Sequence, residues 1–150
     1  MALYAIGDLH LCLGAPKPMD VFGGAWEGYM EKLRDGLSVI TPQDTTVLLG
    51  DLSWALDLQA AKADFSWIDG IPGRKIILKG NHDYWWSTAS KFYQFCENNG
   101  FSNQLILNNN HYEYDGWRSA VPGAGSLRRN AAVSTMKRCF AGNCCGWRPL

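Results

Sequence analysis

The sequence has no hydrophobic run that approaches the length of a membrane-spanning helix. Its first residues, MALYAIGDLH, also lack the basic start and the long apolar stretch of a secretory signal, so we expect a cytoplasmic protein with no membrane partner. In that compartment the five cysteines should be reduced thiols. Internal repeats and low-complexity tracts are missing as well. What the chain does have is 47% hydrophobic residues over 150 positions, which indicates one folded globular domain.

Acidic residues are missing from the last part of the chain. Residues 1–117 hold 8 basic and 14 acidic residues, a net charge of −6, whereas residues 118–150 hold 6 basic residues and no acidic one. This change near Trp117 divides the chain into a candidate domain, 1–117, and a tail, 118–150. We expect the tail to be poorly ordered because it is rich in glycine and short of large apolar side chains.

The composition of the tail allows two functional interpretations that we do not favour. Its basic residues could contact nucleic acid, but they lack regular spacing and interleaved aromatic residues, so we expect no nucleic-acid partner. Cys139, Cys144 and Cys145 could hold a metal, but no CxxC pair or histidine accompanies them.

The remaining sequence alternates between strand and helix patterns. Three short apolar runs, at 3–8, 45–51 and 74–81, are rich in β-branched residues and end in glycine followed by a polar residue, which predicts buried strands. Between and after them, apolar residues recur at helical spacing over 26–40, 58–68 and 87–97. This βαβαβα pattern predicts an α/β fold with a largely parallel sheet covered by helices.

Polar side chains follow each predicted strand. Asp8 and His10 come after the first, Asp51 after the second, and the Asn-His-Asp triplet 81–83 after the third. Because the carboxyl ends of parallel strands meet at one edge, these groups should converge there, and two residues spaced as Asp8 and His10 are would point the same way in an extended segment. One such aspartate is usually a turn or cap residue, but the repetition after three strands favours a site for divalent Mn, Fe or Zn.

The tryptophans beside these segments are interpreted as packing residues of the core or its rim. They are Trp26, Trp54, Trp67, Trp85 and Trp86.

The three blocks DLH, GDLSW and GNHDYWW resemble the successive Asp-x-His, Gly-Asp and Gly-Asn-His-(Asp/Glu) blocks of the calcineurin-like metallophosphoesterases, in order and at strand ends. The resemblance covers roughly residues 1–117. Within the family, the sequence is most similar to a bacterial branch of small cytosolic members. It implies the N-terminal half of an αββα sandwich. It also implies a phosphohydrolase that uses two divalent metal ions and metal-activated water on a small phosphate ester or nucleotide.

The resemblance assigns a role to each matching residue. Asp8 and His10 would bind the first metal, Asp51 would bridge both ions, and Asn81 would bind the second. His82 would give a proton to the leaving group, because histidine titrates near neutral pH. The remaining residue of the triplet, Asp83, would orient that imidazole and complete the catalytic pair.

The family's later histidine blocks have no counterpart after Trp117. His111, in NNNHYEYDGW, matches neither block and is interpreted as a loop or strand-surface histidine. The amino acids of the tail allow codons that, read one base earlier, encode a sequence similar to the family's continuation, with an amphipathic helix pattern. We therefore expect a truncated chain whose reading frame shifted after Gly116.

A non-catalytic remnant that binds one metal or a partner protein is the alternative to an active phosphoesterase. Substrate, metal and oligomeric state stay open.

Overall fold

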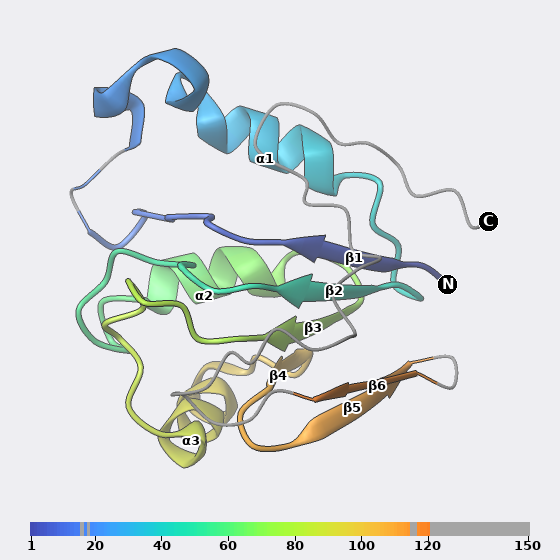
Figure 1. The fold of residues 1–150 in the computed structure, drawn as a ribbon. Coiled ribbons are helices and arrows are strands. Elements are labelled where there is room, and N and C mark those ends of the chain that lie inside the picture. Colours follow the sequence, from blue (N-terminus) through green and yellow to red (C-terminus); the bar gives the residue numbers. More distant parts are fainter. Residues whose placement is uncertain (16, 18, 115–116, 121–150) are drawn as a thin grey trace.

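The structure is a computed structural model that describes residues 1–15, 17, 19–114 and 117–120, with the backbone alone at residues 25 and 117–120 (Figure 1). The predicted tail, 118–150, therefore falls mostly outside the described residues. Within them, no helix combines the length and the apolar character needed to cross a bilayer.

The centre of the fold is a four-stranded parallel sheet with the strand order β1-β2-β3-β4 (Figure 1). Its strands are β1 (Leu3–Ile6), β2 (Thr45–Leu48), β3 (Arg74–Ile77) and β4 (Gln104–Ile106). The register places Val47 of β2 between Ala5 of β1 and Ile76 of β3. The three predicted strands and their parallel arrangement are confirmed, and β4 is a fourth strand that the apolar pattern did not reveal.

Helices cover one face of this sheet. They are α1 (Tyr29–Leu37), α2 (Lys62–Asp69) and α3 (Ala89–Asn99), with the short 3-10 helices η1 (Met19–Phe22) and η2 (Gly24–Trp26) before α1. Each α-helix turns an apolar stripe toward the sheet, and α3 buries Phe92, Phe95 and Cys96. The Thr88 side chain caps α3 by accepting a hydrogen bond from the Lys91 amide at 3.2 Å. All three predicted helices are confirmed, although Trp26 lies in η2 and not in α1.

The two faces of the sheet carry separate apolar clusters because side chains alternate along each strand. Leu48 and Ile77 belong to the large cluster under the helices, whereas Val47 and Ile76 belong to a smaller cluster on the opposite face. Tyr112 packs against this smaller cluster from β5 (His111–Tyr114), which pairs antiparallel with β6 (Trp117–Ala120). His111 is exposed at the start of β5, which confirms its interpretation as a strand-surface residue.

Two titratable side chains, Lys75 and Cys96, are buried in the fold. Lys75 of β3 is fully buried, and its Nζ atom donates hydrogen bonds to three backbone carbonyls of the turn between α2 and β3, including those of Asp69 at 3.3 Å and Gly73 at 3.1 Å. Burial lowers the pKa of Lys75 to about 8. Burial also raises the pKa of the Cys96 thiol on α3 to about 12.

Candidate metal centre

The segments that follow β1 and β2 run side by side beyond the sheet. The amide of Asp8 donates a hydrogen bond to the carbonyl of Gly50 at 3.0 Å, and the amide of His10 donates to the carbonyl of Asp51 at 2.9 Å. These bonds extend the pairing of the two parallel strands past their ends. The polar residues after both strands are thereby held at one edge, as the sequence predicts.

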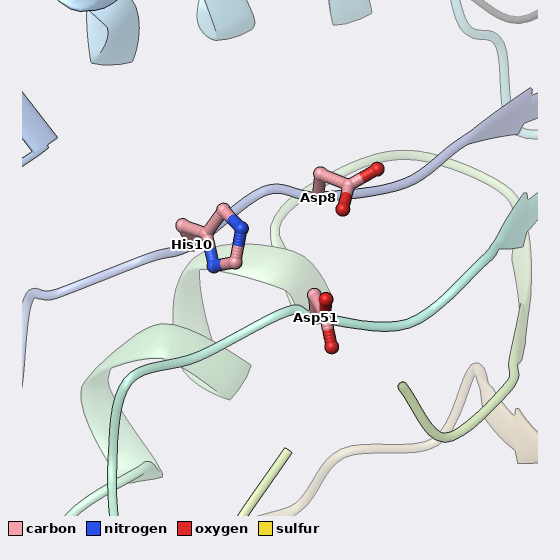
Figure 2. A group of neighbouring side chains, drawn as sticks. All are labelled: Asp8, His10 and Asp51. Atoms are coloured by element: carbon pink, nitrogen blue, oxygen red, sulfur yellow. The ribbon is translucent and has the colours of Figure 1, made fainter. Parts of the chain in front are cut away.

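Three predicted ligands meet at this edge. One ligand atom each from Asp8, His10 and Asp51 lies within 4.8 Å of the other two (Figure 2). Asp8 and His10 come from the segment after β1, and Asp51 faces them from the segment after β2 (Figure 2). The cluster opens to solvent on the Asp8 side, because Asp8 is exposed, His10 is half-buried and Asp51 is only 8% exposed.

The backbone at these three residues is left-handed. Their φ angles are 57° at Asp8, 45° at His10 and 54° at Asp51, and among the described residues Asn109 is the one other non-glycine with positive φ. Asp8 and His10 therefore do not come together through the extended segment that we expected. Each such residue costs about 1–3 kcal/mol of backbone strain, and strain of this kind concentrates at functional sites.

Two glycines allow the segments after β2 and β3 to approach each other closely. A Cβ atom at Gly80 would collide with the carboxylate and the amide of Asp51, and one at Gly50 would collide with the backbone of Gly80. Gly50 also has φ of 96°, which disfavours any residue with a side chain. The glycines before Asp51 and Asn81 are thus required by the close backbone contact at the site.

Asp83 joins the same two segments through its carboxylate, which is 1% exposed. Oδ2 accepts hydrogen bonds from the amides of Asp51 at 2.8 Å and Gly80 at 2.7 Å, and Oδ1 accepts from the amide of Leu52 and the indole of Trp85, both at 2.8 Å. We expected Asp83 to orient the His82 imidazole. The structure instead shows it fixing the backbone that carries Asp51.

His82, the second residue of the Asn-His-Asp triplet, lies at the rim of the cluster. The amide of His82 donates a hydrogen bond to Oδ1 of Asp51 at 2.8 Å, and the two imidazole centroids of His82 and His10 are 6.1 Å apart. Asn81 is exposed. Its backbone is held on both sides, because the amides of Gly80 and His82 bind the carboxylates described above.

A second buried carboxylate, Asp64 of α2, fastens the segments after β1 and β2 to the helix layer. It accepts hydrogen bonds from the Ser53 hydroxyl and from the Leu13 amide, the latter at 2.8 Å. Burial raises the pKa of Asp64, and these hydrogen bonds act in the opposite direction. The base of the site is therefore anchored to the sheet and to α2.

The donor set fits a divalent cation. Burial lowers the pKa of His10 below its usual value, although the charges of Asp51 and Asp8 partly offset this effect, so the imidazole is favoured in the neutral form that binds metals. Within the described part of the chain, the buried Nδ1 atoms of His10 and His82 have no hydrogen-bond partner. Two carboxylates and a neutral imidazole are ligands that Mn, Fe and Zn accept.

Aromatic rings surround the two histidines, and we did not expect this from the sequence. The Trp54 ring stacks on His10 with centroids 4.9 Å apart and also contacts His82 at 5.5 Å. Trp26 approaches His10 edge-on at 6.0 Å, and Tyr84 approaches His82 at 6.2 Å. The packing interpretation is confirmed, since Trp85 is 2% exposed and the other four tryptophans pack against the core. Trp26 and Trp54 contact the His10 ring as well, which that interpretation did not include. The sequence held one signal of this position, because Trp54 follows the predicted ligand Asp51 closely in GDLSW.

The chain is similar to a known protein family and to a solved structure. A model of the calcineurin-like phosphoesterase family matches residues 1–138, which extends beyond Trp117. The crystal structure of a protein of unknown function from Aquifex aeolicus is similar, with 24% sequence identity and a TM-score of 0.46. That similarity covers 79% of this chain and 58% of the Aquifex chain. A search of curated proteins gave no match. Because the family model covers most of the sequence, the chain belongs to the calcineurin-like phosphoesterase family, a family of hydrolases.

Proposed function

We propose that this protein is a metal-dependent phosphoesterase whose reaction centre is the cluster at the carboxyl edge of β1, β2 and β3. The observation that carries the proposal is the convergence of ligand atoms from Asp8, His10 and Asp51 within 4.8 Å. The left-handed backbone at all three residues supports it, because this costly geometry is compensated where a ligand is bound.

The family arrangement implies two divalent ions at this ligand set. Asp8 and His10 would hold the first, Asp51 would bridge both through its two carboxylate oxygens, and Asn81 would bind the second with a neutral oxygen. The neutral amide adds no negative charge where a phosphate must bind. The chemistry that bound divalent ions supply is activation of a water molecule and neutralisation of phosphoryl charge.

His82 is the proposed proton donor to the leaving alkoxide. Its Nδ1 atom is buried, so the proton for the leaving group sits on the other ring nitrogen, Nε2, of this half-buried side chain. The backbone amide of His82 donates to Oδ1 of Asp51, which fixes the proton donor relative to the bridging carboxylate. Asp83 positions both residues by binding the backbone beside them.

The proposed substrate is a small phosphate ester or nucleotide. A second candidate function is binding of a single metal without turnover. It is favoured by the ligand count, because among the described residues the family arrangement leaves only Asp51 and Asn81 for the second ion, and the remaining histidine, His111, lies on β5.

Hydrolysis of p-nitrophenyl phosphate by the full chain, with Mn²⁺, Fe²⁺ or Zn²⁺ added, tests the proposal. Turnover should depend on the metal and should fall by about a hundredfold or more in Asp51→Asn, because a bridging oxygen and its charge are altered. Asp35→Asn, which changes an exposed aspartate on α1, is the matched control and should leave turnover unchanged. Turnover without metal, or full turnover in Asp51→Asn, contradicts the proposal. Metal binding without turnover selects the second candidate.

A further inference from the structure

Three rings at the site form one contiguous cluster. The Trp54 indole lies 4.9 Å from the His10 ring, with only 18° between the planes, and 5.5 Å from the His82 ring at 48°. The two imidazoles are 6.1 Å from each other. Trp26 contacts the His10 ring but has no ring contact with His82 among the described residues. Trp54 therefore touches both histidines to which the proposed function assigns a role.

Nothing polar in the described residues fixes the planes of these imidazoles. A metal-binding histidine usually donates its second ring nitrogen to a carboxylate or carbonyl, which sets the orientation of the ring. Here the Nδ1 atoms of His10 and His82 are both buried without a partner among the described residues. The nearby carboxylate of Asp83 is occupied by backbone amides and the indole of Trp85. Packing must therefore determine where the rings point.

Trp54 is itself held in place from several directions. Its Nε1 atom donates a hydrogen bond to Sδ of Met19 at 3.3 Å, and its backbone amide donates to the carbonyl of Leu11 at 3.0 Å. The Nζ atom of Lys17 lies 3.5 Å from the centroid of the ring, a cation–π contact. All three partners belong to the segment that follows β1 and carries His10. The indole is thus a fixed surface against which an imidazole can be oriented.

We propose that Trp54 is a positioning residue of the metal centre. Its indole stacks on His10 and contacts His82, and this ring packing sets both imidazole planes in place of the usual second hydrogen bond. The roles of His10 as a ligand and of His82 as a proton donor rest on the proposed function. The ring contacts of Trp54 with His10 and His82 do not depend on those roles.

Two measurements on the full chain test this role. The affinity for Mn²⁺ is measured by calorimetry, and the side-chain proton resonances of the histidines are measured by NMR in the metal-free protein. Trp54→Ala removes the ring, Trp54→Phe restores a smaller ring, and Trp67→Ala removes an indole that packs against the core from α2. Trp54→Leu keeps apolar bulk without a ring and replaces the alanine variant if that variant does not fold.

We expect Trp54→Ala to weaken Mn²⁺ binding by about ten- to a hundredfold, the effect typical of losing a residue that orients a ligand. The resonances of both His10 and His82 should move, since the ring current of the indole is lost. Trp54→Phe should recover most of the affinity. Trp67→Ala should leave affinity and both resonances unchanged even if it lowers the melting temperature.

Wild-type affinity for Mn²⁺ in Trp54→Ala or Trp54→Leu would overturn the inference. So would a phenylalanine variant that binds no better than the ringless ones. A wild-type chain that binds no Mn²⁺ overturns the proposed function instead. In that case the NMR comparison of Trp54→Leu with the wild type decides the role of Trp54. Rings of His10 and His82 that lose their wild-type nuclear Overhauser contacts with neighbouring protons support it, and rings that keep those contacts contradict it.

Discussion

Replacing Asp83 with asparagine should destabilise the fold and loosen the metal centre together. Each carboxylate oxygen of Asp83 accepts two hydrogen bonds at 2.7–2.8 Å, Oδ2 from the amides of Asp51 and Gly80 and Oδ1 from Leu52 and the Trp85 indole. An asparagine offers one oxygen and one NH₂ group. Whichever way this amide faces, two buried donors lose their acceptor and meet another donor.

The size of the effect follows from these two lost bonds. A hydrogen bond to a charged group contributes about 1.5–3 kcal/mol, so losing two costs about 3–6 kcal/mol. Small domains are stable by only about 5–15 kcal/mol, so the variant should lose a large fraction of its free energy of unfolding. Affinity for Mn²⁺ should fall as well, because the amide of Asp51 is one of the four donors.

Urea unfolding followed by tryptophan fluorescence measures this loss. Asp57→Asn is the matched control, since Asp57 is an exposed carboxylate that accepts one hydrogen bond, from the Ala60 amide at 2.8 Å. The control should lose about 1 kcal/mol or less. The reasoning fails if Asp83→Asn is destabilised no more than Asp57→Asn, because the four hydrogen bonds would then contribute little to the fold.

Three further predictions use the same unfolding assay. Gly80→Ala should destabilise the chain and abolish Mn²⁺ binding, because the new Cβ collides with Asp51; wild-type affinity would contradict this contact. Lys75→Met should cost about 1–3 kcal/mol per carbonyl left unpaired in the turn before β3, and an unchanged urea midpoint would refute that expectation. Burial raises the pKa of Cys96 from 9.0 to about 12, so the unfolded chain loses this proton at a lower pH than the folded chain does, and stability should fall as the pH rises from 9 toward 12. Cys96→Ala should make this fall in stability less steep. An equally steep fall in the variant would exclude Cys96 as its cause.

The sequence was sufficient to predict the parts of the fold that depend on local pattern. Apolar runs closed by glycine located β1, β2 and β3, and Gly100, with φ of 74°, ends α3 where the Asn98-Asn99-Gly100 run indicates a stop. The strand β4 was not predicted because its three residues, Gln104–Ile106, are too few to show an alternation of apolar and polar side chains. The register of such a short strand depends on its neighbour β3.

The candidate site was predictable in its residues but not in its geometry. Asp8, His10 and Asp51 stood out because polar residues recur after consecutive strands. Their left-handed backbone could not be foreseen, since it comes from the pairing of the two segments beyond the sheet. The hydrogen bonds of Asp83 and the ring contacts of Trp54 depend likewise on segments far apart in the sequence that meet only in the folded chain.

Calorimetric titration of the full chain with Mn²⁺ tests the central claim most directly, because it does not depend on substrate or turnover. The wild-type protein should bind Mn²⁺, Asp8→Asn should lose at least tenfold in affinity as a metal-binding carboxylate becomes an amide, and Asp35→Asn should bind as the wild type does. Equal affinity in all three proteins, or no binding by the wild type, would contradict a metal centre at Asp8, His10 and Asp51.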